Sequence, residues 1–211
     1  MPTPYELDLT ASQVNGALNA AYDTGDPVTS GSTKLVRSDA VYNAIVAQIR
    51  ELFGWGFWVD STYTSGSPLA VSTSSVQITC DGLGGSTELS YLPTNVTTFW
   101  DTSTGTITPE AVGDAFDFRL DFKCDSSAGG TEASQVTLIL DIGAGGSPIV
   151  ILQQAIPLPI SGVNTISTGF PLFALTTFLA NGGKFYLYTD INTVDVYDID
   201  LFIKRDFSAI T

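Results

Sequence analysis

Residues 116–124, which read FDFRLDFKC, alternate apolar and charged side chains without a break. Every second residue is Phe, Leu or Cys, and those between are Asp, Arg, Asp and Lys. Strict alternation at period two is typical of a β-strand with one face in a core and the other in water. Antiparallel sheets with one covered face are built from such strands. We therefore expect Phe118 and Phe122 to be buried in an antiparallel β-sandwich.

Further stretches of strand character lie on both sides of this one, separated by turns. Gly143 to Gly146 form a hairpin tip, because the loop lacks the Lys-Ser/Thr of a phosphate-binding loop and no helix follows. Eight or more short strands predict a β-sandwich or jelly roll, and no helix-length pattern interrupts them as in a parallel α/β sheet. The other strands are expected at residues 76–80, 136–142, 149–155, 164–168, 172–179, 184–189 and 197–204.

Two helix-like segments precede the β region. Residues 9–22 begin with a capping-box pair, Thr10 and Gln13. Residues 26–51 run from a turn-rich part into a second helix, on which apolar residues recur at the a/d spacing of a short coiled coil. A lone helix of roughly 12–15 residues is marginal in water, so this one needs a partner. Periodicity leaves open whether other copies or the chain's own domain cover the stripe Tyr42, Ile45, Ile49 and Leu52.

The segment GSTKLVRSDAVYNAI, residues 31–45, resembles one that recurs in bacteriophage fibre proteins. The shared positions are a Gly-Ser-Thr turn, an aliphatic residue, a Ser-Asp step and Ala-Val-Tyr-x-Ala-aliphatic. It differs at Lys34 and Arg37, where small or uncharged residues are usual. The resemblance implies a trimerising or virion-proximal element.

An aromatic cluster, Phe53-Gly-Trp-Gly-Phe-Trp58, follows the second helix, and Gly54 is its expected stop. Four large aromatic side chains in six residues are costly to leave in water. We expect them to close the base of the next domain around a symmetry axis; a ligand platform is the alternative. The predicted trimer interface is Tyr42, Ile45, Ile49, Leu52, Trp55 and Phe57.

A second resemblance rests on Trp100, Ile107, Pro109 and the Gly113-Asp114 step that precedes the 116–124 strand. Their spacing is similar to the C-terminal domain of small phage fibre and virion-surface proteins. Those domains resemble jelly rolls of the tumour-necrosis-factor class and are usually trimers. The resemblance implies a mainly β chain with an N-terminal helical attachment and trimerisation module at residues 1–56. Residues 57–211 would form an antiparallel β-sandwich head.

No catalytic or metal site is expected, and of the nucleophilic sites only a Ser-Lys or Thr-based one stays open. The sequence has no histidine, which removes the usual general base and the commonest metal ligand. Carboxylates at Asp190, Asp195, Asp198 and Asp200 are candidates for a glycan-cleaving pair or, with Asn192, for a Ca²⁺ site. Asp198 and Asp200 alternate with apolar residues, which is typical of the solvated face of a strand.

Cys80 and Cys124 are the only cysteines, and both stand in strand-like surroundings. In a chain made in the cytosol, two buried thiols are the expected state, with a disulfide as the alternative. We also predict no cofactor and no metal.

The net charge of −14 argues against nucleic acid and against an anionic membrane surface as partners. It suits an exposed particle surface, because strong charge keeps a protein soluble. No signal peptide and no membrane-spanning run is expected. Residues 1 to about 37 have little apolar surface, so we expect an arm that contacts another virion protein through Leu7, Leu9, Val14 and Leu18.

These observations predict a non-enzymatic phage virion protein, assembled in the host cytoplasm as a homotrimeric fibre or spike. Two alternatives remain open at the level of sequence. One is a receptor-binding fibre that recognises a host glycan or surface protein, and the other is a capsid decoration protein.

Overall fold

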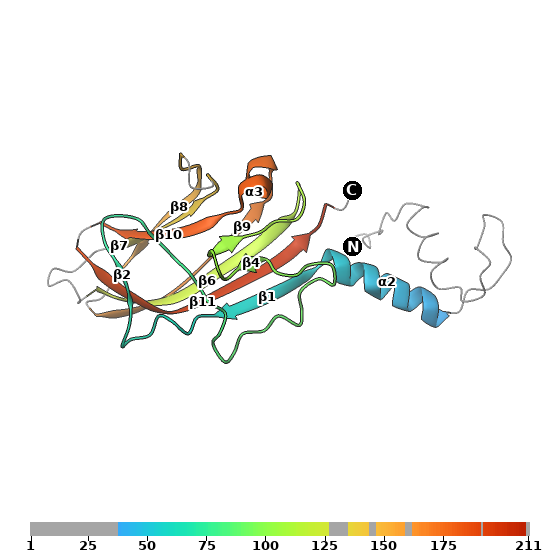
Figure 1. Cartoon of the computed structure of the whole chain (residues 1–211), viewed down its shortest axis with the longest axis horizontal. Helices are drawn as coiled ribbons and strands as arrows, with labels where there is room; N and C mark the ends of the chain where they lie inside the picture. The colour runs from blue at the N-terminus through green and yellow to red at the C-terminus, as the bar shows by residue number, and fades with distance from the viewer. Residues whose placement is uncertain (1–37, 127–134, 144–146, 159–161, 191, 210–211) are drawn as a thin grey trace, which may run out of the picture. The chain divides into compact units, whose positions relative to one another are not determined.

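The computed structural model describes residues 38–126, 135–143, 147–158, 162–190 and 192–209. The chain divides into a first unit, Met1–Glu51, and a second unit, Leu52–Thr211. Helix α2, Ser38–Leu52, is the described part that leads from the first unit into the second (Figure 1). The division falls a few residues before the predicted 56–57 boundary, because strand β1, Gly54–Val59, begins directly after the helix. The expected helix at 9–22 and the four arm residues lie outside the described part.

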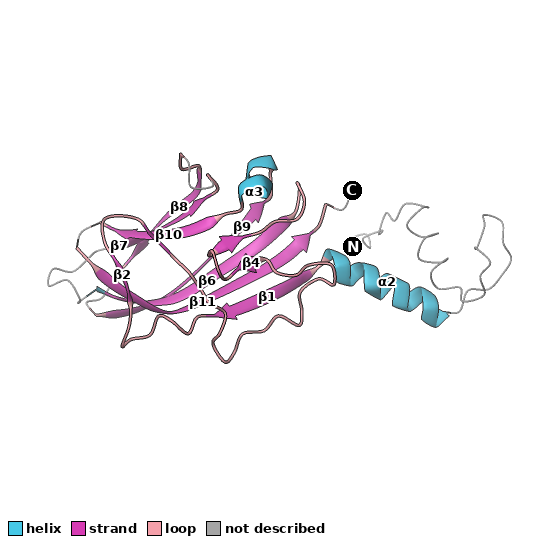
Figure 2. Cartoon of the chain, viewed as in Figure 1, coloured by secondary structure: helices cyan, strands magenta, loops and turns pink. Residues whose placement is uncertain are grey.

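The second unit is built from two antiparallel sheets, as Figure 2 shows in magenta. One sheet has the order β1-β11-β6-β9, with β2 also paired to β11, and the other has the order β3-β10-β7-β8. Strands β4 and β5 form a separate pair. The strands after β1 are β2 Leu69–Val71, β3 Val76–Gln77, β4 Trp100–Asp101, β5 Thr106–Ile107, β6 Ala115–Asp125, β7 Gln135–Asp141, β8 Val150–Pro157, β9 Val163–Phe173, β10 Lys184–Thr189 and β11 Val194–Phe207.

The pairing of these strands is nested. Among the strands on the two main sheet paths, the first pairs with the last (β1 with β11), and the next pair inward is β3 with β10. Then β6 pairs with β9, and β7 pairs with β8 across the hairpin predicted from sequence. This order is that of a jelly roll, in which a long antiparallel ribbon closes into two facing sheets. The predicted fold class, an antiparallel β-sandwich, is confirmed.

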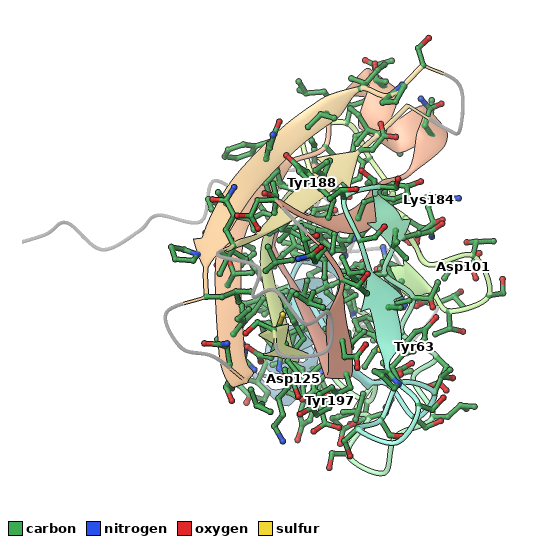
Figure 3. All side chains as sticks on the ribbon, turned by 90° about the vertical axis from the view of Figure 1, so that its left-hand side faces the viewer. Tyr63, Asp101, Asp125, Lys184, Tyr188 and Tyr197 are labelled. Atoms are coloured by element: carbon green, nitrogen blue, oxygen red, sulfur yellow. The ribbon has the colours of Figure 1, made fainter. Side chains whose placement is uncertain are left out.

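The core lies between the sheets, and β6 faces it as its alternation predicts. Phe118 and Phe122 are each 2% exposed, so the predicted strand faces are confirmed. The Phe118 ring stacks on Phe170 of β9 at 5.6 Å and meets Phe185 of β10 edge-on at 6.1 Å. Phe185 belongs to the opposite sheet, so this aromatic group joins the two layers. Figure 3 shows side chains filling the space that the strands enclose.

One predicted strand is wrong. Residues 172–179 were expected to be extended, but β9 ends at Phe173 and helix α3, Thr176–Asn181, follows. The run reads as a strand because it is apolar, yet only Phe178 of α3 is buried. The helix stops at Gly182, which has φ +70° and donates its N–H to the carbonyl of Phe178. Strand β3 is also shorter than the predicted 76–80, since it covers Val76–Gln77.

Within the described ranges, no helix is both long enough and apolar enough to pass through a membrane.

Candidate functional site

Most of the a/d stripe of α2 is exposed in the described part of the chain. Tyr42 is 67% exposed, and Ile45 and Ile49 are 38% and 41% exposed. Leu52, where the helix ends, is half-buried. An apolar row left in water on a short helix is unfavourable, because exposed apolar area costs about 25 cal/mol per Å² relative to burial. Four of the six predicted interface residues therefore lie along one helix, three of them exposed to solvent.

The other two predicted interface residues, Trp55 and Phe57, lie on β1. This strand sends Trp58 into the core, where it is 1% exposed, and Gly56 leaves room for it. A Cβ at Gly56 would lie 2.4 Å from the Trp58 ring. Trp55 and Phe57 alternate with these residues and so belong to the outer face of the sheet. The aromatic cluster is therefore divided between the core and the outer face of the sheet. It does not close the base of the domain as one group.

Trp55 already has aromatic neighbours in its own chain. Its ring stacks on Tyr91 at 4.6 Å and lies 5.7 Å from the ring of Phe202, on β11. The guanidinium of Arg119 lies over the Phe202 ring, 5.3 Å from its centroid. These four side chains form a row across the outer face of the β1-β11-β6-β9 sheet, which we call the aromatic row. Tyr91 is the most accessible of its rings, at 57% exposure.

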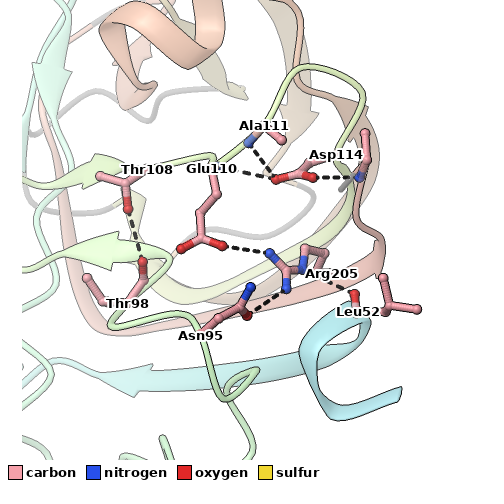
Figure 4. Close-up of polar contacts among 9 residues, drawn as sticks. Leu52, Asn95, Thr98, Thr108, Glu110, Ala111, Asp114 and Arg205 are labelled. Carbon is pink, nitrogen blue, oxygen red and sulfur yellow. Dashed lines mark hydrogen bonds and ion pairs between the residues drawn. The ribbon is translucent and has the colours of Figure 1, made fainter. Parts of the chain in front are cut away.

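A buried arginine lies where the helix passes into the head (Figure 4). Arg205 of β11 is fully buried. Its Nε donates to the carbonyl oxygen of Leu52 at 3.2 Å, and its Nη1 pairs with Glu110 Oε2 at 2.8 Å. Nη2 donates to Asn95 Oδ1 at 3.4 Å, and the guanidinium lies 5.6 Å from the ring centre of Phe99. One cation thus ties the last helical residue to two loops and to a core aromatic.

Sequence reasoning missed Arg205, although a signal was present. Leu201, Ile203 and Arg205 share one face of β11 at period two, and the first two are core residues. A charged residue at an inward position predicts a buried ion pair, because an unpaired charge there would be very costly.

Asp114 explains the Gly113-Asp114 step noted in the sequence. Its side chain is fully buried and accepts three backbone N–H groups, which also appear in Figure 4. They come from Glu110 at 3.2 Å, Ala111 at 3.0 Å and Ala209 at 3.1 Å. Gly113 has φ +100°, a region that disfavours a side chain. The step is therefore a structural turn that holds residue 209 against the 110–114 loop.

Two of the candidate carboxylates, Asp198 and Asp200, lie near each other on β11. Asp198 has φ +52°, lies at the register shift of β11, and forms an exposed ion pair with Lys123 Nζ at 2.9 Å. Asp200 lies opposite Asp121 on β6. Burial raises the pKa of Asp200 above its usual value, and the Asp121 and Asp198 charges add to this. Among the described residues, no group of three or more acidic or cysteine side chains is placed to hold a metal ion.

Cys80 and Cys124 are free and buried, as predicted. Burial raises the pKa of each thiol to about 12. Thiolates are the reactive form, so neither residue is set up as a nucleophile or a redox centre.

No protein-family model and no curated protein sequence matches this chain. Several solved structures are similar at low identity. A tumour necrosis factor, Eiger, from S. frugiperda has a TM-score of 0.48 at 13% identity, over 76% of this chain and 96% of its own. The PRD1 vertex protein P5 has a TM-score of 0.39 at 17% identity, over 74% and 73%. A Cowpea mosaic virus top-component structure gives 0.29 at 12% identity, over 87% and 91%. The jelly-roll assignment rests on the strand pairings given above.

Proposed function

We propose that this chain is a non-enzymatic bacteriophage virion protein, a homotrimeric fibre or spike on the particle surface. The observation that carries the proposal is the exposed part of the α2 stripe, Tyr42, Ile45 and Ile49, on a helix of 15 residues. Such a helix is marginal alone in water. Identical helices from neighbouring copies would bury the stripe in a short coiled coil, as the resemblance to fibre proteins implies.

Three copies fit the stripe better than two. Ile45 at a d position with Ile49 at an a position disfavours the parallel dimer, in which Leu is preferred at d. Leu52 at the next d position weakens this preference. The phage domains that the sequence resembles are usually trimers, which also supports three copies.

The remaining features agree with a structural role on a particle surface. Of the candidate carboxylates for glycan cleavage, Asp198 forms an exposed ion pair with Lys123. The net charge of −14 disfavours nucleic acid and anionic lipid as partners. The partners we propose are other copies of the chain and, through the arm residues Leu7, Leu9, Val14 and Leu18, a non-identical capsid or tail protein.

Attachment is tested by removing the arm. The chain lacking residues 1–34 should fold and trimerise but fail to join particles in a phage deprived of its own copy of the protein. The full chain is the control, and locating it on the particle separates capsid decoration from a tail fibre. If the shortened chain is incorporated as well as the full chain, the attachment surface lies on the β-domain.

A receptor-binding head is the second candidate, favoured by the exposed Tyr91 ring stacked on Trp55. Tyr and Trp are enriched at the surfaces by which proteins contact partners. Purified full chain should then compete with phage for host cells, and Tyr91→Ala should lose that competition while keeping the wild-type melting temperature. If the variant competed as well as the unmodified chain, Tyr91 would not be part of a receptor-binding surface.

A further inference from the structure

One edge of the jelly roll is made from a part of the sequence without charge. No Asp, Glu, Lys or Arg occurs between Asp141 and Lys184, in a chain that has 22 acidic and 8 basic residues. This part supplies β8 and β9, which end the two sheets. A cavity of about 570 Å³ lies between them, lined among others by Ile156, Pro157, Val163 and Ile166. We call β8, β9 and their flanking residues 149 and 174–175 the uncharged edge.

The uncharged edge exposes large apolar side chains from both strands. Phe173 and Leu175 are each 66% exposed, and the consecutive residues Ile149, Val150 and Ile151 are exposed as well. Edge strands in monomeric proteins are usually protected by charged side chains, above all Lys. Here that protection is missing, which is typical of a surface that is covered in the assembled protein.

The edge is suited to contact through side chains more than through added strands. Pro157 and Pro171 lie on β8 and β9 and lack the N–H that a continuing ladder needs. These prolines interrupt backbone pairing with another strand. The apolar side chains beside them remain free to pack.

We infer that the uncharged edge is the surface by which the head contacts a second copy of this chain. The inference rests on the homotrimer proposed above and assigns the β-domain a share in it. Each copy carries a net charge of −14, so copies repel one another. An uncharged contact avoids burying like charges and still removes apolar area from water. A foreign partner of this acidic protein would gain by opposite charge, which this edge does not offer.

The outer faces of β6 and β11 lack these properties. Arg119, Lys123 and Lys204 alternate there with carboxylates and pair with them in exposed ion pairs. Covering those faces would require desolvation of these charges. The uncharged edge is therefore the favoured contact.

The test uses the full chain and two substitutions at the edge, Ile151→Asp and Phe173→Asp. Leu83→Asp is the matched control, because Leu83 is 76% exposed and lies outside the edge. Sedimentation velocity over a dilution series should show half-dissociation of the edge variants at a concentration at least tenfold above that of wild type. Leu83→Asp should dissociate like wild type, and circular dichroism should show the same β content in all four proteins.

Hydroxyl-radical footprinting of the unmodified chain provides a test that needs no variant. Oxidation of Phe173 and Leu175 should be suppressed at assembling concentration and restored on dilution, while Leu83 stays equally reactive. The inference would be overturned if the edge variants dissociated like Leu83→Asp, or if the oxidation of Phe173 did not change on dilution. Either result would leave the proposed homotrimer standing. A wild-type chain that is monomeric throughout would overturn both.

Discussion

Arg205 shows how a buried charge can be accommodated at the start of the head. Its guanidinium is fully buried but has the carbonyl of Leu52, the carboxylate of Glu110 and the amide oxygen of Asn95 as acceptors. Glu110 keeps 35% of its side chain in solvent, so only one of the two charges is deeply desolvated. Such a group fixes geometry more than it adds net stability.

Removing this cation should be costly. We expect Arg205→Met to lower the free energy of unfolding by roughly 3 kcal/mol, the low end of the cost of breaking a buried pair, because Glu110 can still be hydrated. Arg119→Met is the control: its ion pair with Asp121 is half exposed and should be worth roughly 1 kcal/mol or less. Chemical denaturation measures both. Equal losses would show that burial of Arg205 has no special role.

Asp200 should make stability fall as the pH rises. Burial raises its pKa above 3.8 in the folded chain, so the native state binds its proton more tightly than the unfolded chain does. Asp200→Asn should therefore raise the melting temperature at about pH 7. The gain should vanish at about pH 3, where Asp200 is protonated in both the folded and the unfolded chain.

Asp101 provides a control of opposite sign. Hydrogen bonds from Ser103 and then Thr104 lower its pKa, so Asp101→Asn should reduce the melting temperature near about pH 7. A loss of stability in Asp200→Asn at neutral pH would contradict the assigned environment.

At the scale of elements, β6 determines the core. Phe118 is 2% exposed and touches aromatic rings from both sheets. Phe118→Ala should lower the free energy of unfolding by roughly 3–5 kcal/mol, because the cavity it leaves cannot fully close. Thr73→Ala, at an exposed position before β3, should change it by less than about 0.5 kcal/mol. An unchanged melting temperature in Phe118→Ala would mean that the strand faces are reversed.

The elements that sequence predicted well are those whose pattern is local. The alternation of residues 116–124 determined both the strand and its buried face, and the turn at Gly143 marked the β7–β8 hairpin. Helix α3 was not predicted, because six residues are too few to show a helical period and its apolar residues resemble a strand. The aromatic cluster was only partly understood: Trp58 enters the core, while Trp55 meets Tyr91 from a distant loop. Such a contact leaves no trace in local spacing.

The same limit applies to the candidate site. The a/d stripe of α2 could be read directly, since it follows helical spacing. The acceptors of Arg205 come from residues 52, 95 and 110, and only the closed jelly roll brings them together. The uncharged edge required the topology, because sequence alone does not show that β8 and β9 end their sheets.

At the scale of the whole molecule, the trimer proposed above is the property that can be tested most directly. The feature that supports it is the exposed stripe of α2, and the contact inferred at the uncharged edge of the head depends on it. They belong to different units of the chain, so each can be altered while the other is kept.

Light scattering of the purified full chain tests this claim most directly. The account predicts a monodisperse particle of about three times the monomer mass of 22.3 kDa. It also predicts that the double change Ile45→Asp and Ile49→Asp weakens the assembly, because it places charges in an apolar seam. A monodisperse monomer at micromolar concentration would contradict the account.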